Sequence, residues 1–372
     1  MKKRILSLLL MLVMVLGVAS CGGTTDDGGE TAQPDTDVEE PVVDDAEEPA
    51  DTEEAAEDTE EPAEKEKIRV GVLVWKYDDT YGSTVRQAIE KYAKELGDAA
   101  GVEIELDMQD GKDDQATQND QATVMLANEP DVMVVNLVDV AAGQSIIDMI
   151  KPYEIPTIFY NKEPTDSAVI TEYSHKSIFI GTDIAQAGVM QGDLLSKIWE
   201  ENPQYDRNGD GVCQYLMFQG EPNNPEAIAR TEYSVKQAEE QGMTMDLVNG
   251  EIIVANWDTA SAQDQMNATW ANLGDQIEAI FCNNDDMALG VIAALNGVGW
   301  NLGDDPDKFI PIIGVDATDA AMEAMSAGTM AGSVKQDGDA MGKAIIEIAL
   351  NAGLAKDFLE GTDYEIYEDG YS

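Results

Sequence analysis

The stretch Arg69-Val-Gly-Val-Leu-Val-Trp75 sets the pattern that the rest of this 372-residue chain repeats. It is an apolar run of strand length, and Val85, Ile89, Tyr92 and Leu96 then recur at the spacing of one helical face. Further strands are expected at 103–108, 131–137, 156–160 and 178–180, and then at 214–218, 251–255, 277–282, 309–315 and 330–335. Apolar strands separated by helices predict parallel sheets that are covered on both faces. Two consecutive sets predict an α/β fold of two doubly wound lobes.

The first 20 residues have the composition of a secretory signal peptide. A basic Met1-Lys-Lys-Arg4 precedes an apolar run from Ile5 to Val18, which is shorter than the roughly 20 residues that span a bilayer. Val18-Ala-Ser-Cys21 resembles a bacterial lipobox, in which the cysteine becomes the lipidated first residue. The alternative is an ordinary signal peptide with a chance cysteine. The lipobox predicts a protein anchored through Cys21 to the outer face of the cytoplasmic membrane, with no membrane span.

An acidic segment follows, and we expect residues 21–67 to be a disordered linker. Residues 24–67 contain 20 Asp or Glu and two Lys, which is −18 of the formal net charge of −52. They lack the aromatic and large apolar residues needed to offset chain entropy. Such a charge also excludes nucleic acids and anionic membrane surfaces as partners, because both are polyanions.

The folded remainder, about 305 residues, is long enough for two domains. Ligands of doubly wound sheets bind beyond the carboxyl ends of the strands. The loops at those ends are rich in Asp, Asn, Gln and Glu, and they lie at 76–81, 161–164, 220–230, 256–258, 283–286, 316 and 336–337. Turn chemistry alone explains one such loop, but seven at one end of two sheets predict a site for a polar ligand.

The residue types in these loops favour a carbohydrate. Carboxylate, amide and guanidinium groups can form paired hydrogen bonds with sugar hydroxyls. Aromatic rings can cover the apolar faces of a pyranose. Tyr81 and Trp257 belong to different lobes, so we expect them to close on opposite faces of one ring.

Six motifs in these loops resemble the type I periplasmic (solute-binding) protein family, in its galactose- and glucose-binding branch. They are Lys76-Tyr-Asp-Asp79, Asn161-Lys-Glu-Pro164, Gly220-Glu-Pro222 with Ala229-Arg230 behind it, Trp257-Asp-Thr-Ala260, Asn283-Asn-Asp285 and Gly314-Val-Asp-Ala317. The likeness runs from about residue 67 to residue 363. With the lipobox, it implies a Gram-positive lipoprotein that presents a hexose, D-galactose and/or D-glucose, to an ABC importer.

The resemblance also implies which residues bind the sugar. Asp79 corresponds to a carboxylate that accepts sugar hydroxyls, and Tyr81 and Trp257 to the two stacking aromatics. The family's hydrogen-bonding positions are matched directly by Asn161, Arg230, Asn284 and Asp316. Departures occur at Asn224, where the family has His, at Glu226 in place of Asp, and at Gln336 in place of Asn. All three keep hydrogen-bonding ability.

The family's chain crosses between the lobes, which gives the expected domain boundaries. The first crossing is expected near 181–183 and the second near 336–337. The N-terminal lobe is then 68–181 plus 337–365, and the C-terminal lobe is 182–336. A third crossing would begin at Tyr371-Ser372, so a hinge in this chain would have two links in place of three. We expect a monomer whose two lobes close on the sugar.

The stretch Asp206-Arg-Asn-Gly-Asp-Gly-Val-Cys-Gln214 places oxygen side chains at alternate positions, as the start of a calcium loop does. An EF-hand would close with Glu at position twelve, but that position is Met217. In the family the closing glutamate comes from far along the chain, and here that residue is Glu278. The resemblance therefore implies a structural Ca²⁺ in the C-terminal lobe, bound by Asp206, Asn208, Asp210, the carbonyl of Val212, Gln214 and Glu278.

That register also predicts that the two remaining cysteines stay unpaired. Cys213 points to the opposite face of its strand from Gln214, and Cys282 lies four residues beyond Glu278. We therefore expect both to be small buried residues.

Three other classes of protein compete with a transport protein. A glycosidase would need two carboxylates, for which Asp79 and Asp316 are candidates, but His175 has no partner motif for a nucleophile triad. We therefore expect a protein that is not an enzyme and place His175 on the surface. A sugar-responsive repressor is disfavoured by the signal segment. A sugar sensor that presents its ligand to a receptor has the same sequence signature as a transport protein.

Overall fold

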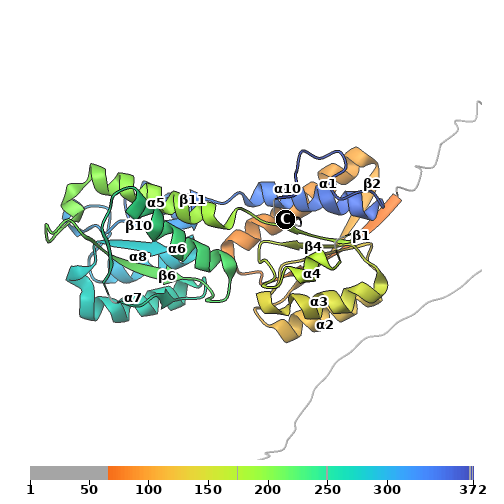
Figure 1. Ribbon diagram of the computed structural model, residues 1–372, viewed down its shortest axis with the longest axis horizontal. Helices are drawn as coiled ribbons and strands as arrows, with labels where there is room; N and C mark the ends of the chain where they lie inside the picture. The colour runs from red at the N-terminus through yellow and green to blue at the C-terminus, as the bar shows by residue number, and fades with distance from the viewer. Residues whose placement is uncertain (1–65, 174, 249, 368–369, 371) are drawn as a thin grey trace, which may run out of the picture. The chain divides into compact units, whose positions relative to one another are not determined.

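The computed structural model describes residues 66–173, 175–248, 250–367, 370 and 372 (Figure 1). The predicted signal peptide, Cys21 and most of the acidic linker lie outside the described residues. Among the helices that are described, none combines the length and the apolar character needed to cross a bilayer.

The first lobe is built on a five-stranded parallel sheet with the order β2-β1-β3-β4-β5. Its strands are β1 (Glu66–Val74), β2 (Val102–Asp110), β3 (Val132–Val135), β4 (Thr157–Tyr160) and β5 (Ser177–Ile180). Its helices are α1 (Thr80–Ala100), α2 (Gln115–Ala127), α3 (Gly143–Ile150), α4 (Ala168–Thr171) and α10 (Gly338–Gly353). One core lies between the sheet and α1 and α10, and a second between the sheet and α2, α3 and α4.

The second lobe repeats this architecture with a sheet of order β11-β10-β9-β6-β7, in which β8 also pairs with β6. Its strands are β6 (Cys213–Gln219), β7 (Met245–Leu247), β8 (Ile253–Val254), β9 (Ala279–Cys282), β10 (Ile312–Asp316) and β11 (Gly332–Lys335). Its helices are α5 (Ile184–Glu201), α6 (Pro225–Glu240), α7 (Thr259–Leu273), α8 (Asp285–Gly297) and α9 (Asp319–Ser326). Short 3-10 helices lie at Val140–Ala142, Lys151–Tyr153, Pro203–Tyr205, Gly274–Gln276 and Pro306–Lys308.

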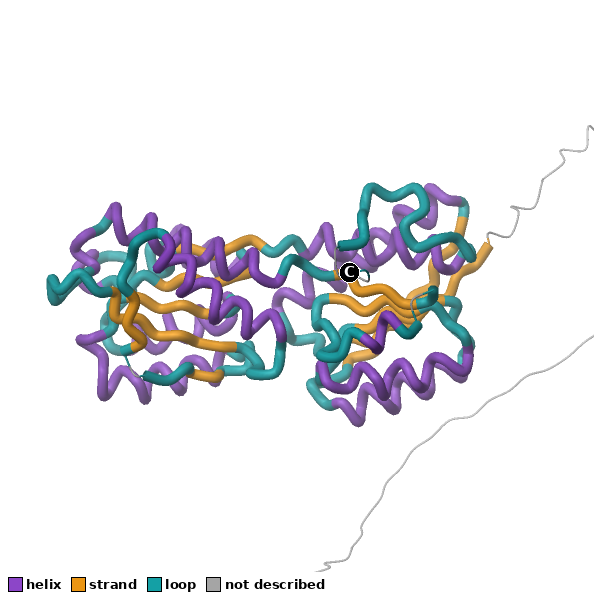
Figure 2. The backbone as a smooth tube through the Cα atoms, viewed as in Figure 1, coloured by secondary structure: helices purple, strands orange, loops and turns teal. Residues whose placement is uncertain are grey.

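The predicted fold class is confirmed, because both sheets are parallel and helices cover each of them (Figure 2). The chain passes from β5 of the first sheet to α5 through residues 181–183, and from β11 back to α10 through residues 336–337. In both sheets the strand order reverses at the first strand, β1 or β6. Crevices at such reversals are where ligands of doubly wound sheets bind.

Several predicted boundaries are wrong by a few residues. β1 begins at Glu66, so Glu66 and Lys67 belong to the sheet and not to the linker, and Lys67 pairs with Glu105 of β2 at 3.0 Å. β10 begins at Ile312 and not at 309, because a 3-10 helix and then Pro311, which has no N–H to donate, precede it. The short edge strand β7 was not predicted, since three residues are too few to show an alternating pattern.

Candidate ligand-binding site

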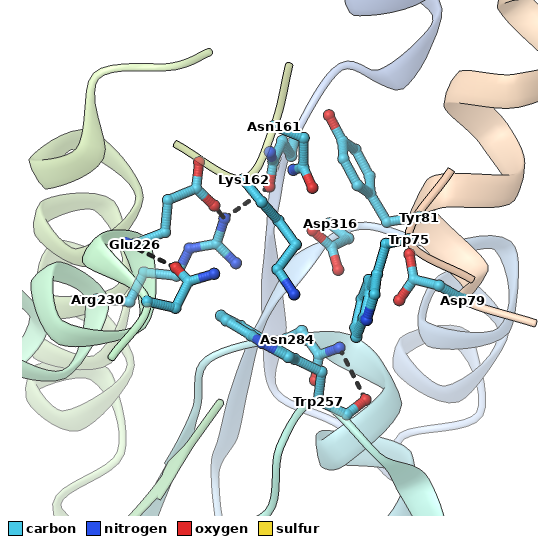
Figure 3. A pocket seen from close by; sticks show the side chains of 12 residues that line it. Trp75, Asp79, Tyr81, Asn161, Lys162, Glu226, Arg230, Trp257, Asn284 and Asp316 are labelled. Atoms are coloured by element: carbon cyan, nitrogen blue, oxygen red, sulfur yellow. Dashed lines mark hydrogen bonds and ion pairs between the residues drawn. The ribbon is translucent and has the colours of Figure 1, made fainter. Parts of the chain in front are cut away.

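A pocket lies where the loops of the two lobes meet. All ten residues expected to contact a ligand line it, and most appear in Figure 3. The first lobe contributes Asp79, Tyr81 and Asn161, the second contributes Asn224, Glu226, Arg230, Trp257, Asn284 and Asp316, and Gln336 comes from the second crossing. Trp75 and Lys162 line the pocket as well and were not predicted.

Asp79 is fixed at the start of α1. It is the N-cap of that helix, and its Oδ1 accepts a hydrogen bond from the Gly82 N–H at 2.5 Å. The side chain is 8% exposed, and burial raises the pKa of the carboxyl group, while the Gly82 hydrogen bond opposes this rise. The cap uses one oxygen of the carboxylate, which leaves further acceptor sites for a ligand.

Arg230 organises the second lobe's side of the pocket from inside α6. Its guanidinium donates to Glu226 Oε2 at 2.6 Å, to Gln336 Oε1 at 2.7 Å and to the Asn283 carbonyl at 2.8 Å. It also lies 5.6 Å from the centre of the Trp257 ring. These contacts hold one residue from the helix, one from the crossing and one strand end in fixed positions.

Two buried polar groups in the pocket can form further hydrogen bonds. The Asp316 side chain is 9% exposed, and burial holds the pKa of its carboxyl group well above the usual range, with the charge of Arg230 acting in the opposite direction. The Nε2 of Gln336 is buried and has no hydrogen-bond partner within the described protein. An acceptor and a donor at one pocket match a ligand whose hydroxyl groups can both donate and accept.

The backbone is unusual at three of the lining residues. Asn161, Trp257 and Asp316 have φ angles of 59°, 64° and 113°, which side-chain-bearing residues seldom adopt. Asn161 and Trp257 follow the ends of β4 and β8, and Asp316 is the last residue of β10. Gly220 lies against Trp257, and a Cβ atom at this glycine would overlap the indole ring. Strained backbone of this kind clusters at binding sites, where the surrounding structure maintains it.

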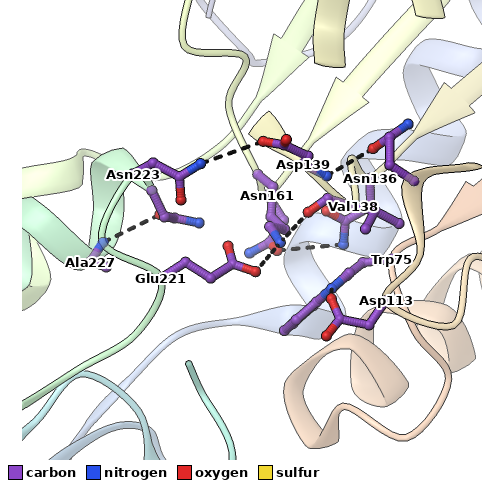
Figure 4. A network of polar contacts seen from close by, with 12 residues as sticks. Trp75, Asp113, Asn136, Val138, Asp139, Asn161, Glu221, Asn223 and Ala227 are labelled. Atoms are coloured by element: carbon purple, nitrogen blue, oxygen red, sulfur yellow. Dashed lines mark hydrogen bonds and ion pairs between the residues drawn. The ribbon is translucent and has the colours of Figure 1, made fainter. Parts of the chain in front are cut away.

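Trp75 and Lys162 belong to a polar network that reaches from the first lobe to the second. Figure 4 shows Trp75 with Asp113, and Glu221 of the second lobe. The Trp75 indole donates to Asp113 at 2.5 Å. Lys162 Nζ lies 4.0 Å from the centre of the Trp75 ring, donates to the Val138 carbonyl at 2.8 Å and pairs with Glu221 of the second lobe at 2.9 Å. Burial lowers the pKa of Lys162, and the charge of Glu221 opposes this shift. Neither residue could be assigned to the site from its sequence context. A tryptophan at the end of an apolar strand is usually a core residue, and a lysine in a loop is usually exposed.

Glu278 contacts the backbone of the predicted metal loop. Glu278 Oε1 accepts hydrogen bonds from the Arg207 N–H at 2.7 Å and the Asn208 N–H at 3.4 Å, and Oε2 accepts from the Gln214 N–H at 3.3 Å. Asp206 accepts hydrogen bonds from the N–H groups of residues 209, 210 and 211. The loop is thus folded around these two carboxylates.

The remaining loop side chains converge on Asp210. Asn208 Nδ2 and Gln214 Nε2 donate to Asp210 Oδ2 at 2.9 Å and 3.1 Å. Within the described residues, no three His, Cys, Asp or Glu side chains form a group that could hold a metal ion by themselves. The carboxylates of the predicted ligand set are too few to hold a cation by themselves. The set fits a hard cation when its amide and carbonyl oxygens are included, and Ca²⁺ accepts this mixture of ligands.

Three predictions about other residues match the structure. Cys213 and Cys282 are buried and free. The register pairs Phe218 with Cys282, which places the two cysteines five residues apart along neighbouring strands. His175 is exposed.

The family described as "Periplasmic binding protein domain" matches residues 70–357. The chain therefore belongs to the periplasmic binding proteins. The relatives that it matches are solute-binding components of transporters and not enzymes. The expected family and the absence of an enzymatic role are both confirmed by this membership.

Among individual proteins, the chain is 37% identical to the D-galactose/methyl-galactoside binding periplasmic protein of Haemophilus influenzae, over 80% of this chain and 85% of that protein. It is 29% identical to a putative rhizopine-binding protein of Rhizobium meliloti, over 76% of this chain and 83% of that protein. Of the solved structures, an ABC transporter solute-binding protein from Bacillus halodurans with bound myo-inositol has 25% identity and a TM-score of 0.63, and covers 79% of this chain and 92% of its own.

Proposed function

We propose that this protein binds a hexose, D-galactose and/or D-glucose, between its lobes and delivers it to an ABC importer. The observation that carries the proposal is the pocket itself, in which two aromatic residues from different lobes accompany carboxylate, amide and guanidinium groups. The similarity to a galactose-binding relative supports the same ligand class. Other relatives and structural neighbours bind ribose, inositol or allose. Family membership therefore does not specify the sugar, and the residues of this pocket determine it.

In the proposed complex each residue type has a separate task. Tyr81 and Trp257 cover the two apolar faces of the sugar ring. Asp79 and Asp316 accept hydroxyl hydrogens, and Asn161, Asn224, Asn284 and Gln336 donate and accept. Arg230 donates to the sugar while Glu226 holds it in place at 2.6 Å. Because these groups come from both lobes, the bound sugar stabilises the arrangement in which the lobes meet.

We further propose a structural Ca²⁺ in the second lobe, held by Asp206, Asn208, Asp210, the Val212 carbonyl, Gln214 and Glu278. The support is the donor set together with the position of Glu278, whose carboxylate contacts both ends of the loop. When bound, the ion would tie the loop to the start of β6 and to the segment before β9. It takes no part in contacting the sugar.

Location and partners complete the proposal. A lipid on Cys21 would tether the protein to the outer face of the cytoplasmic membrane, and the acidic segment up to residue 65 would act as the tether. A permease of an ABC transporter would recognise the closed form of the monomer. Presentation of the sugar to a sensory receptor is the second candidate, and it uses the same pocket.

Isothermal titration calorimetry with D-galactose, D-glucose, D-ribose, L-arabinose and myo-inositol tests the proposal. We expect saturable one-to-one binding of at least one of the two hexoses, more tightly than any other member of the panel. Tighter binding of ribose or inositol would contradict the assignment as a hexose-binding protein. Absence of heat with every sugar would refute sugar binding altogether.

A further inference from the structure

The helix α1 begins at the pocket and lacks an acidic side chain in its own first turn. Its N-cap, Asp79, satisfies the Gly82 N–H. The other N–H groups of a first helical turn have no partner within the helix, and the end of the helix carries a partial positive charge. A carboxylate next to this end would therefore be stabilised, and it would stabilise the helix in return.

The second lobe supplies such a carboxylate. Asp286 lies in the first turn of α8, two residues after its N-cap Asn284. Its Oδ1 accepts a hydrogen bond from the Thr80 hydroxyl at 2.8 Å, a contact between residues 206 positions apart and in different lobes. Burial raises the pKa of Asp286, and hydrogen bonds from the Thr80 hydroxyl and backbone N–H oppose the rise.

Asp286 is not one of the residues that line the pocket. Its neighbours Asn284 and Asp79 are lining residues, one in each lobe. The Thr80–Asp286 contact thus joins the two lobes directly beside the pocket but outside it. The Lys162–Glu221 ion pair joins the same lobes through a residue of the pocket wall. Of these two contacts, only the first joins two side chains that both lie outside the pocket lining.

We propose that Asp286 is a positioning residue for ligand binding, which caps α1 from the opposite lobe and thereby stabilises the form in which the lobes enclose the pocket. The contact exists only while the lobes are together, so it contributes to the closed form and not to the open one. Its effect is to slow ligand release rather than to speed ligand capture. The inference rests on the proposed function, because a hexose is the probe.

The experiment measures association and release of D-galactose by stopped-flow tryptophan fluorescence, with Trp75 and Trp257 in the pocket as reporters. The variants are Asp286→Ala, Asp286→Asn, Thr80→Val and the double variant Thr80→Val/Asp286→Ala. Glu323→Gln, which alters an exposed acidic residue of the same lobe, is the matched control. Circular dichroism and the melting temperature of the ligand-free proteins show that each variant is folded.

We expect Asp286→Ala to raise the release rate about tenfold, as the loss of a charge-assisted hydrogen bond implies, with an association rate within twofold of the parent. Asp286→Asn, which keeps an acceptor, should fall between Asp286→Ala and the parent. The double variant should release galactose no faster than Asp286→Ala, because both substitutions remove one contact. A variant that fails to fold leaves the other three to decide.

Release rates equal to those of the parent and the control in both Asp286→Ala and Thr80→Val would overturn the inference while leaving hexose binding intact. If the parent binds D-glucose and not D-galactose, D-glucose replaces galactose as the probe. Failure of the parent to bind either hexose would instead contradict the proposed function. In that case small-angle X-ray scattering of the ligand-free protein tests whether Asp286 stabilises the closed form. A larger radius of gyration for Asp286→Ala than for the parent supports the role, and identical values refute it.

Discussion

At the scale of single residues, the pocket holds its side chains in place with contacts that a ligand does not provide. One guanidinium group, that of Arg230, donates to Glu226, Gln336 and the Asn283 carbonyl at 2.6 to 2.8 Å. Asp79 is fixed by a helix cap. Side chains that are already fixed lose little conformational freedom on binding, so more of the contact energy remains as affinity.

Asp79→Asn should weaken hexose binding by about 1.5–3 kcal/mol. The single oxygen of the amide can still cap α1, but the second carboxylate oxygen that would accept a hydrogen bond from a sugar hydroxyl is lost. Calorimetry with the best sugar of the panel measures the change. Asp114→Asn is the matched control, since Asp114 caps α2 through the Thr117 N–H in the same lobe and is not a lining residue. Equal affinities of the Asp79 variant and the parent would show that Asp79 does not contact the sugar.

Gly220→Ala should also reduce hexose affinity, by a cost of about 1–3 kcal/mol, because a Cβ atom there overlaps the Trp257 ring and must displace it from the pocket wall. The change in intrinsic tryptophan fluorescence on sugar binding reports the displacement. Gly297→Ala is the control, since no atom lies within 4 Å of the added Cβ. If both variants bind like the parent, the position of Trp257 does not determine affinity.

At the scale of elements, the sequence predicts the strands and the helices between them well where the apolar runs are long. The failures include β7, which has three residues, the start of β1, which lies at Glu66, and the start of β10, which a proline delays. All ten predicted lining residues lie at the end of a strand, in the loop after it or in the first two turns of the next helix, since the carboxyl ends of parallel strands meet at one edge. Trp75 and Lys162 escaped prediction because their roles depend on where their side chains point and on Glu221, 59 residues from Lys162.

The buried start of α8 should make stability depend on pH. Burial raises the pKa of Asp285 to about 6, although Ser333 and the Thr318 N–H donate hydrogen bonds to it. The folded state then binds this proton more tightly than the unfolded state does. The contribution of Asp285 to the free energy of unfolding is therefore retained at pH 4 and lost as the pH rises towards 6 and above.

Asp285→Asn removes this titration, so its free energy of unfolding should fall less than that of the parent between pH 4 and pH 7. The difference is on the order of 1–3 kcal/mol. Urea unfolding at several pH values in this range measures it. Parallel pH profiles for the two proteins would show that Asp285 has an ordinary pKa in the folded protein.

The metal loop leads to a separate prediction. Chelation with EGTA should lower the melting temperature of the parent by a few degrees, as the loss of a bound ligand does. Glu278→Gln should melt at the same temperature with and without EGTA, because it lacks the carboxylate that closes the site. Galactose affinity in the presence of EGTA is the control and should not change. An equal effect of EGTA on both proteins would contradict the role of Glu278.

At the scale of the whole molecule, both lobes contribute side chains to the same pocket. The chain passes between the sheets at 181–183 and at 336–337, and the second passage itself carries Gln336 into the pocket. Contacts between the lobes also come from Thr80 with Asp286 and from Lys162 with Glu221. Under the proposed function, ligand contacts and lobe contacts stabilise the same arrangement.

A crystal structure of the protein grown with D-galactose would test the proposed site most directly. We expect one sugar ring between Tyr81 and Trp257, with Asp79 accepting hydrogen bonds from its hydroxyl groups and Arg230 donating to it. A sugar bound elsewhere, or a ring that contacts residues of one lobe alone, would contradict it.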